Sequence, residues 1–168
     1  MAWDIVRLTK AHDGSAFSCG VPSLDEFLQR YVTQYEKRNL GRTFVLVRDG
    51  GPQVLGYFTL AVGHITKADL PEEEAKKLPK HPIPIALLGR LAADQSVRGQ
   101  GLGADLLAEA LSIAVGMSER AGVFAVCVDA IDDAGSKFYQ KHGFTPLQDQ
   151  PNRLFLPIGA IPSDTGTP

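Results

Sequence analysis

The chain has 168 residues, of which 44 % are apolar and 21 % charged, and its formal net charge is −2. These values are ordinary for one globular domain with a substantial core. They give no global basic surface, so a nucleic-acid partner would have to bind a local patch. No apolar run reaches the length of a membrane span and the first residues lack a signal-peptide pattern, so we expect a cytoplasmic protein. Cys19 and Cys127 are too few and too far apart for a disulfide scaffold or a zinc site, and we expect two buried thiols.

The first part of the chain predicts a strand followed by a helix. Residues 3–8 form the expected strand. Ser23 and Glu26 have the spacing of a capping box, with Ser23 as the N-cap residue. Apolar residues then recur at helical spacing as far as Tyr35.

A hairpin and a short helix follow. The strand-like runs at residues 43–48 and 54–62 flank Asp49-Gly-Gly-Pro52, a sequence typical of a hairpin turn. Residues 69–78 carry acids at their start and bases at their end, as the helix macrodipole favours. Three prolines then exclude regular structure before Ile85.

The most informative stretch joins an apolar strand at residues 85–93 to a long amphipathic helix at residues 101–120. The loop between them has glycines at positions 99, 101 and 103. Glycine lets the backbone approach a ligand, and free N–H groups at a helix start attract phosphate oxygens. Arg98 adds a forked cationic donor. This arrangement predicts a pyrophosphate cradle, with an ordinary glycine turn as the simpler alternative.

The same glycines, up to Ala104, also match the dinucleotide-binding pattern G-x-G-x-x-[GA]. That fold places its glycines directly after a strand and an acid about 20 residues later. Asp129 lies close enough to the position expected for that acid. Residues 95–98, however, separate the strand from Gly99. Only 39 residues follow Asp129, too few to complete a doubly wound sheet.

The rest of the chain completes an α+β pattern. The remaining expected elements are a buried strand at residues 123–130, a helix at 132–142 closed by Gly143, and strands at 144–147 and 153–156. The order βαββ(α)βαβαββ predicts one domain over residues 1–158, with a mixed sheet between helices. We expect residues 159–168 to be a disordered tail.

Two motifs in this order resemble those of the Gcn5-related N-acetyltransferases (GNAT). The phosphate loop of that family, [QR]-x-x-G-x-[GA], matches Arg98-Gly-Gln-Gly101-Leu-Gly103 at every fixed position. Its later helix carries a tyrosine before a Gly-Phe pair, as in Tyr139 and Gly143-Phe144. The resemblance covers residues 3–157. It implies a mixed, mostly antiparallel sheet of six to seven strands with about four helices, acetyl-CoA as co-substrate, and no metal.

Shorter matches are similar to the tRNA-acetylating toxins of bacterial toxin–antitoxin pairs. They lie, in the same order as in those toxins, at residues 17–20, 24–28, 55–60, 87–92 and 128–130. Such enzymes acetylate the α-amine of an aminoacyl group on charged tRNA, and a ribbon–helix–helix antitoxin inhibits them. The resemblance therefore implies acetyl-CoA, aminoacyl-tRNA, an antitoxin of that type and a second copy of the chain as partners.

The resemblance also implies the residues that bind acetyl-CoA. Backbone amides of the strand before the phosphate loop face the pantetheine and the thioester in the family. The corresponding residues are Leu91, Ala92 and Ala93, and the loop itself contributes Arg98, Gly99, Gln100, Gly101, Leu102 and Gly103. For any one of the three strand residues, a plain core position is the simpler alternative.

Two candidates lie on the later helix. By resemblance, the Tyr139 hydroxyl protonates the departing thiolate, whereas a core tyrosine is the simpler alternative. Asp132 stands where the wider family often has an asparagine that binds the pantetheine. We favour helix capping for Asp132.

Arg90 lies inside the apolar run at residues 85–93, where an unpaired charge is costly to bury. One interpretation is a buried ion pair with Asp129. The other directs Arg90 into the acceptor cleft, where it would bind a phosphate or the terminal adenosine of tRNA. We favour the second.

No glutamate occupies the strand that supplies a general base in many relatives. A water chain could deprotonate the amine instead, or an α-amine could need little help. The ordinary pKa of an α-amine is about 7.7–8.0, whereas that of lysine is about 10.4, so the α-amine has the larger neutral fraction near pH 7.5.

Two groups of basic residues could contact tRNA, although a solvated surface is the simpler explanation for each. They are Arg30, Lys37, Arg38 and Arg42 on and after the first helix, and Lys76, Lys77, Lys80 and His81 before the central strand. Two other functions stay open: acetylation of a small amine or a protein N-terminus, and a CoA-binding or antitoxin-binding module without turnover.

Overall fold

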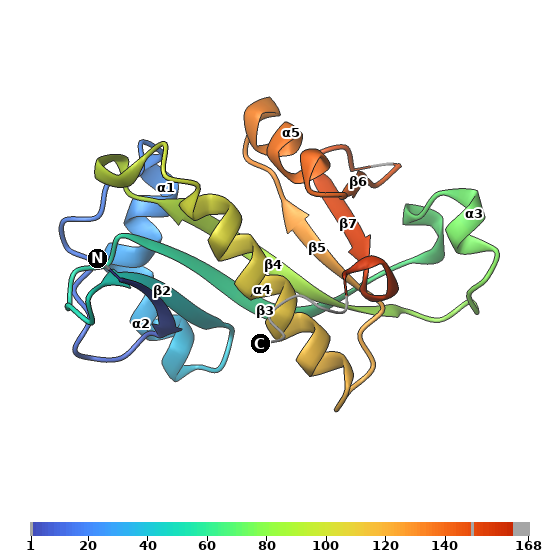
Figure 1. The fold of residues 1–168 in the computed structure, drawn as a ribbon. Coiled ribbons are helices and arrows are strands. Elements are labelled where there is room, and N and C mark those ends of the chain that lie inside the picture. The colour runs from blue at the N-terminus through green and yellow to red at the C-terminus, as the bar shows by residue number, and fades with distance from the viewer. Residues whose placement is uncertain (1, 149, 163–168) are drawn as a thin grey trace. The chain divides into compact units, whose positions relative to one another are not determined.

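The computed structural model describes residues 2–148 and 150–162 (Figure 1). Its strands are hydrogen-bonded in one sheet in the order β1-β2-β3-β4-β5-β7-β6. The predicted α+β class and strand number are confirmed. Contacts divide the chain into two compact units, Met1–Ala61 with Gly89–Ala110 and Val62–Leu88 with Leu111–Pro168.

Three antiparallel strands form the framework of the first unit. They are β1 (Trp3–Arg7), β2 (Arg42–Arg48) and the first half of β3 (Gly56–Ile65), with β2 paired to both of its neighbours. The predicted hairpin turn is present between β2 and β3. Asp49 and Gly50 take positive φ angles of 53° and 69°, which favours a small flexible residue and accounts for the Asp-Gly sequence.

The helix predicted after Ser23 consists of three consecutive segments: α1 (Pro22–Glu26), a π-helical segment (Phe27–Tyr31) and α2 (Val32–Lys37). The capping box predicted at Ser23 is wrong, because Val21 is the N-cap residue and Pro22 opens the helix. Proline suits the first turn, since its φ is already helical and its missing N–H needs no acceptor there. The helix therefore begins before Ser23.

Helices cover both faces of these strands. Phe27, Leu28 and Val32 pack with Tyr57 and other buried residues in one core cluster. On the opposite face, a Cβ added to Gly56 would lie 3.1 Å from Leu106 Cδ1, in the first turns of α4 (Leu102–Ser118). Gly56 and Tyr57 contact different layers because neighbouring strand residues face opposite ways.

The second unit contains the parallel pair of the sheet. The part of β4 (Ile83–Ala93) from Ile85 to Leu88 pairs in parallel with β5 (Ala125–Asp129). β5 pairs antiparallel with β7 (Arg153–Pro157), and β7 with β6 (Thr145–Pro146). The chain between β5 and β6 forms α5 (Asp133–Lys141).

Two predicted elements in this unit differ from the structure. The helix predicted at residues 69–78 is only a 3₁₀ turn at Lys67–Asp69, opened by a capping box between Thr66 and Asp69, and α3 (Glu72–Ala75). β4 begins at Ile83 and includes Pro84, which the prediction kept out of regular structure. The Pro84 carbonyl accepts a hydrogen bond from the Phe124 N–H at 2.9 Å. This bond uses only the carbonyl, so the backbone N–H that proline lacks is not needed for it.

The end of the described chain is packed. Ile158–Ala160 form a 3₁₀ turn and Ile161 is buried, so these residues are ordered although the predicted disordered tail starts at residue 159. The remainder of that predicted tail, residues 163–168, lies outside the described residues. Within the described part of the chain, no helix has the length and apolar character needed to cross a membrane.

Both cysteines are free and buried, as predicted. Burial raises the pKa of Cys19 to about 11 and that of Cys127 to about 12. Neither thiol is therefore a nucleophile near neutral pH.

Candidate active site

The predicted phosphate loop has the backbone geometry of an anion cradle. Gly99 and Gly101 have φ angles of 80° and 73°, and a Cβ built on either would meet nothing within 4 Å. Ligand oxygens can therefore approach the backbone closely at both positions. The Asp105 N–H is already bonded to the Gly101 carbonyl at 3.2 Å, but the N–H groups of the preceding turn have no acceptor inside the helix. This stretch fits a pyrophosphate group.

The strand directions in the sheet exclude the dinucleotide-binding fold as the alternative. That fold requires a doubly wound, mostly parallel sheet. Here β5 pairs in parallel with β4 but antiparallel with β7, and β7 pairs antiparallel with β6. The glycine loop therefore belongs to a mixed sheet.

Arg98 and Asp94 both bond to the segment that precedes α1. Arg98 Nη2 donates to the Cys19 carbonyl at 2.8 Å. Asp94 is buried, and its Oδ1 accepts the Ser18 N–H at 2.8 Å while its Oδ2 accepts from the N–H and hydroxyl of Ser96 at 3.0 and 2.6 Å. Burial of Asp94 opposes ionisation, but the hydrogen bonds from Ser96 and Ser18 outweigh it, and the pKa of Asp94 is lowered.

The strand residues predicted to face the pantetheine lie at the end of β4. Ala92 is buried in the same core cluster as Phe27 and Tyr57, while Leu91 and Ala93 are half-buried. Their expected contribution comes from backbone amides and stays a prediction.

Arg90 is stacked on aromatic rings. Its guanidinium carbon lies 3.7 Å from the centroid of Phe27 and 5.3 Å from that of Tyr35. The Tyr57 ring is nearly parallel to that of Phe27, with their centroids 6.2 Å apart, and the Tyr57 hydroxyl donates to the Leu24 carbonyl at 2.6 Å. The stack stabilises the arginine head group and fixes its plane.

The ion pair suggested between Arg90 and Asp129 is wrong. Asp129 accepts two hydrogen bonds from Arg153, at 2.7 Å from Nε and 2.9 Å from Nη2. The two residues stand opposite each other in the antiparallel pairing of β5 with β7, which explains the bidentate contact.

Tyr139 belongs to the C-terminal cap of α5. The Phe144 N–H donates to the Tyr139 carbonyl at 3.1 Å and the Gly143 N–H to the Gln140 carbonyl at 3.0 Å, while Gly143 has a φ of 99°. These bonds form a Schellman motif, with the rings of Tyr139 and Phe144 in contact 5.6 Å apart. The spacing from tyrosine to Gly-Phe thus has a structural cause. The predicted chemical role rests on the hydroxyl alone.

Burial of the Tyr139 ring, with a smaller effect from the negative charge of Asp129, raises the pKa of its hydroxyl to about 12. The phenol therefore keeps its proton throughout the physiological pH range. At the other end of α5, Asp132 is the N-cap residue, as we favoured, and its Oδ1 accepts the Gly135 N–H at 2.8 Å.

Acidic neighbours partly neutralise the two basic groups predicted to contact tRNA. Glu36 lies 3.0 Å from Arg7 and 3.5 Å from Arg42, and Glu73 lies 3.2 Å from Lys76. The predicted basic residues with exposed side chains are Arg30, Lys37, Arg38, Lys76, Lys77, Lys80 and His81.

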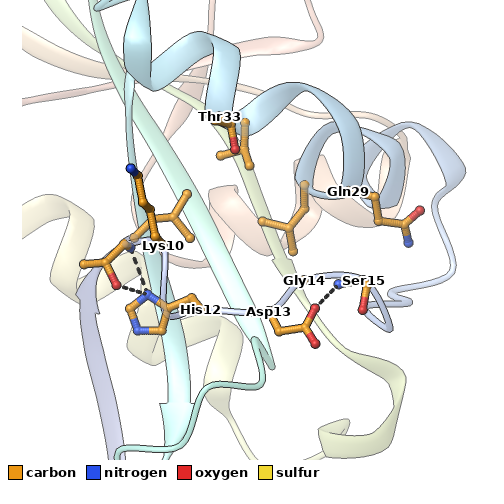
Figure 2. Close-up of a pocket in the computed structure, with 11 residues that line it drawn as sticks. Lys10, His12, Asp13, Gly14, Ser15, Gln29 and Thr33 are labelled. Atoms are coloured by element: carbon orange, nitrogen blue, oxygen red, sulfur yellow. Dashed lines mark hydrogen bonds between the residues drawn. The ribbon is translucent and has the colours of Figure 1, made fainter.

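A separate polar pocket of about 360 Å³ lies between the chain after β1 and the helical region of the first unit (Figure 2). Within it, the Thr9 N–H donates to His12 Nδ1 at 2.9 Å and the Ser15 N–H to Asp13 Oδ1 at 2.9 Å. The described residues that line it include none of the predicted site residues. Within residues 2–148 and 150–162, no group of three or more His, Cys, Asp or Glu side chains could hold a metal ion.

Sequence reasoning missed Asp94 and the aromatic rings beneath Arg90. Asp94 directly precedes the predicted loop, and an acid followed two residues later by serine is a signal for a capped turn. Its bond to Ser18 spans 76 positions of sequence, and no local pattern predicts it.

The fold and the phosphate loop define an acetyltransferase of the GNAT class. The sequence model of the acetyltransferase (GNAT) domain matches residues 39–146. The chain therefore belongs to the GNAT acetyltransferase family.

Relatives within this family are similar over nearly the whole chain. "Probable toxin TacT" of Sinorhizobium fredii (strain NBRC 101917 / NGR234) is 34% identical over 163 residues, which cover 92% of this chain and 90% of the relative. A "tRNA-acetylating toxin" of Mycobacterium tuberculosis (strain ATCC 25618 / H37Rv) is 35% identical over 150 residues and 89% of each chain. The solved structure of AtaT complexed with acetyl-methionyl-tRNAfMet has a TM-score of 0.89 and 34% identity, with 95% of this chain and 97% of that chain covered.

Proposed function

We propose that this protein is an acetyl-CoA-dependent N-acetyltransferase that acetylates the α-amine of aminoacyl-tRNA, and that it acts in the cytoplasm as the toxin of a toxin–antitoxin pair. The observation that carries the proposal is the similarity, over about nine-tenths of both chains, to a tRNA-acetylating toxin and to AtaT bound to acetyl-methionyl-tRNAfMet. A related structure of AtaTR contains acetyl-CoA.

The phosphate loop would hold the pyrophosphate of acetyl-CoA. Gly99 and Gly101 leave room for its oxygens, the first N–H groups of α4 supply donors, and Arg98 still has donors beyond the one bonded to Cys19. Backbone amides of Leu91, Ala92 and Ala93 would face the pantetheine and polarise the thioester carbonyl. Bound acetyl-CoA supplies the activated acetyl group.

The acceptor must present a neutral amine. An α-amine with a pKa of about 7.7–8.0 is substantially neutral near pH 7.5 and needs no dedicated carboxylate base. Its nitrogen forms a bond to the acetyl carbon, the carbon–sulfur bond breaks, and the sulfur leaves with the electron pair. The proton lost by nitrogen balances the one that the thiolate gains.

Tyr139 serves the departing sulfur best as a hydrogen-bond donor. Its pKa of about 12 lies far above the ordinary thiol value of about 8.5. Full proton transfer from phenol to thiolate would thus be uphill by roughly 5 kcal/mol at 1.36 kcal/mol per pKa unit. We therefore infer that Tyr139 stabilises the developing thiolate through its O–H, and that the attacking nitrogen is the net source of the proton.

Arg90 and the exposed basic residues would bind the tRNA. The stacked guanidinium keeps its N–H edge available for a phosphate or a base, and Arg30, Lys37, Arg38, Lys76 and Lys77 supply positive charge. A ribbon–helix–helix antitoxin and a homodimer complete the proposal. A solved complex of AtaT with the C-terminus of the antitoxin AtaR supports an antitoxin as partner, though not its type, and the edge position of β1 in the sheet would permit a homodimer.

The test is incubation with labelled acetyl-CoA and total charged tRNA, followed by nuclease digestion and mass analysis. The proposal predicts an N-acetyl-aminoacyl-adenosine. Acetylation of small amines or peptide N-termini alone would refute the tRNA assignment. Binding of acetyl-CoA without turnover on any acceptor would instead indicate a module without catalysis.

A further inference from the structure

We infer that Asp94 and Gly20 are positioning residues for the phosphate loop: through them the segment Ser18–Gly20 holds the loop in the shape that binds pyrophosphate. The inference rests on the proposed function, because it takes acetyl-CoA as the ligand of the loop. Neither residue belongs to the motif by which the loop is recognised.

The Asp94 carboxylate joins two pieces of backbone that are distant in sequence. Oδ1 accepts the Ser18 N–H, and Oδ2 accepts both donors of Ser96 in the 3₁₀ turn that leads to Arg98. The Gln95 N–H adds a second link, to the Ser18 carbonyl at 2.8 Å. Asp94, the only buried charged side chain among the described residues, thus holds the backbone at the entrance to the loop in place.

Gly20 allows a second contact between the segment Ser18–Gly20 and the loop, the one made by Arg98. It has a φ of 93°, and a Cβ added there would lie 2.9 Å from both Arg98 Nη2 and Gln95 Nε2. The absence of a side chain therefore lets Arg98 reach the Cys19 carbonyl at 2.8 Å. This bond holds the guanidinium at the mouth of the loop, with its remaining N–H groups directed by a fixed plane.

The same segment leads into α1. The Cys19 N–H donates to Asp25 Oδ1 at 2.8 Å, within α1. A displacement of Ser18–Gly20 therefore acts on the loop through three bonds: those of Ser18 with the Asp94 carboxylate and the Gln95 N–H, and that of the Cys19 carbonyl with Arg98.

The experiment measures the Kd of acetyl-CoA by calorimetry, together with kcat and KM, for Gly20→Ala and Asp94→Asn. The matched control for the first is Gly50→Ala, which has a comparable φ of 69° but nothing within 4 Å. The control for the second is Ser96→Ala, which removes one bond to Asp94 and keeps the link to Ser18.

We expect Gly20→Ala and Asp94→Asn to raise the Kd about tenfold, because displacement by a fraction of an ångström misplaces the donors, while kcat at saturating acetyl-CoA stays within about twofold. Both controls should keep the wild-type Kd. Affinity for S-acetylpantetheine, which lacks the pyrophosphate, should be unchanged in all variants. A purely structural role would lower thermal stability without this selectivity.

The possible outcomes distinguish a failure of the positioning role from a failure of the proposed function. If wild-type protein binds acetyl-CoA and Gly20→Ala binds it as Gly50→Ala does, the positioning role is refuted and the proposed function is untouched. Equal weakening of acetyl-CoA and S-acetylpantetheine would also refute it. If the wild-type protein binds no acetyl-CoA, the proposed function fails and this inference fails with it.

Discussion

The substitution Tyr139→Phe isolates one hydroxyl from the structural role of its side chain. The ring contacts with Phe138 and Phe144, at centroid distances of 5.2 and 5.6 Å, are retained, and so are the backbone bonds of the Schellman motif. We therefore expect the free energy of unfolding to change by no more than about 1 kcal/mol. Loss of a hydrogen bond to the developing thiolate should lower kcat by about 10²- to 10³-fold, equivalent to about 2.7–4 kcal/mol.

The assay follows thiol release from acetyl-CoA with charged tRNA as acceptor, at saturating concentrations of both and between pH 6 and 9. Because the Tyr139 pKa is raised to about 12, the wild-type profile should show no break from this residue, and its rise should follow the substrate amine. Tyr31→Phe, which removes an exposed hydroxyl, serves as the control and should retain the wild-type kcat. A stable Tyr139→Phe protein with wild-type kcat would refute the reasoning.

Four further predictions test separate parts of the site. Gly101→Val should raise the Kd of acetyl-CoA at least about 100-fold by calorimetry, because the φ of 73° disfavours a β-branched residue and its side chain would occupy the cradle. Phe27→Leu removes the ring under Arg90, so the KM for charged tRNA should rise several-fold in steady-state kinetics while the Kd of acetyl-CoA stays constant. Asp132→Ala should lower the urea-measured free energy of unfolding by about 1 kcal/mol, and Asp132→Asn, which also caps helices well, should not. The pKa of Asp94 is lowered from its ordinary 3.8, so its carboxylate contributes stability above about pH 4 that is lost as the pH falls through the folded-state pKa; the difference in urea stability between wild type and Asp94→Asn should therefore be full at pH 7 and shrink below pH 4.

Local chemistry made the phosphate loop and the cap after Tyr139 predictable. Gly99, Gly101 and Gly143 all take positive φ, which favours glycine. The residue type at each of these positions therefore indicates the backbone conformation without information from distant residues. The order of elements was readable for the same reason, since each strand and helix has its own period. Ser23 shows the limit even of local rules: a capping-box spacing was present, but Pro22 gave the helix an earlier start.

Contacts between distant residues were not predictable. Asp129 pairs with Arg153 rather than with Arg90 because the register of β5 on β7 places Asp129 opposite Arg153. The register between two strands could not be predicted from the sequence. The π-helical segment at Phe27–Tyr31 and the stacking of Arg90 on Phe27 likewise depend on packing. The link from Asp94 to Ser18 has the same origin.

The most direct test of the central claim compares two acceptors that share one reactive group. An aminoacyl-tRNA and the methyl ester of the same amino acid both present an α-amine next to an ester, so they differ only in the tRNA. If Arg90 and the basic residues bind tRNA, kcat/KM for the aminoacyl-tRNA should exceed that for the methyl ester by at least about 10³, since binding energy remote from the amine is used in the transition state. A ratio near one would contradict the claim and identify the protein as an acetyltransferase of small amines.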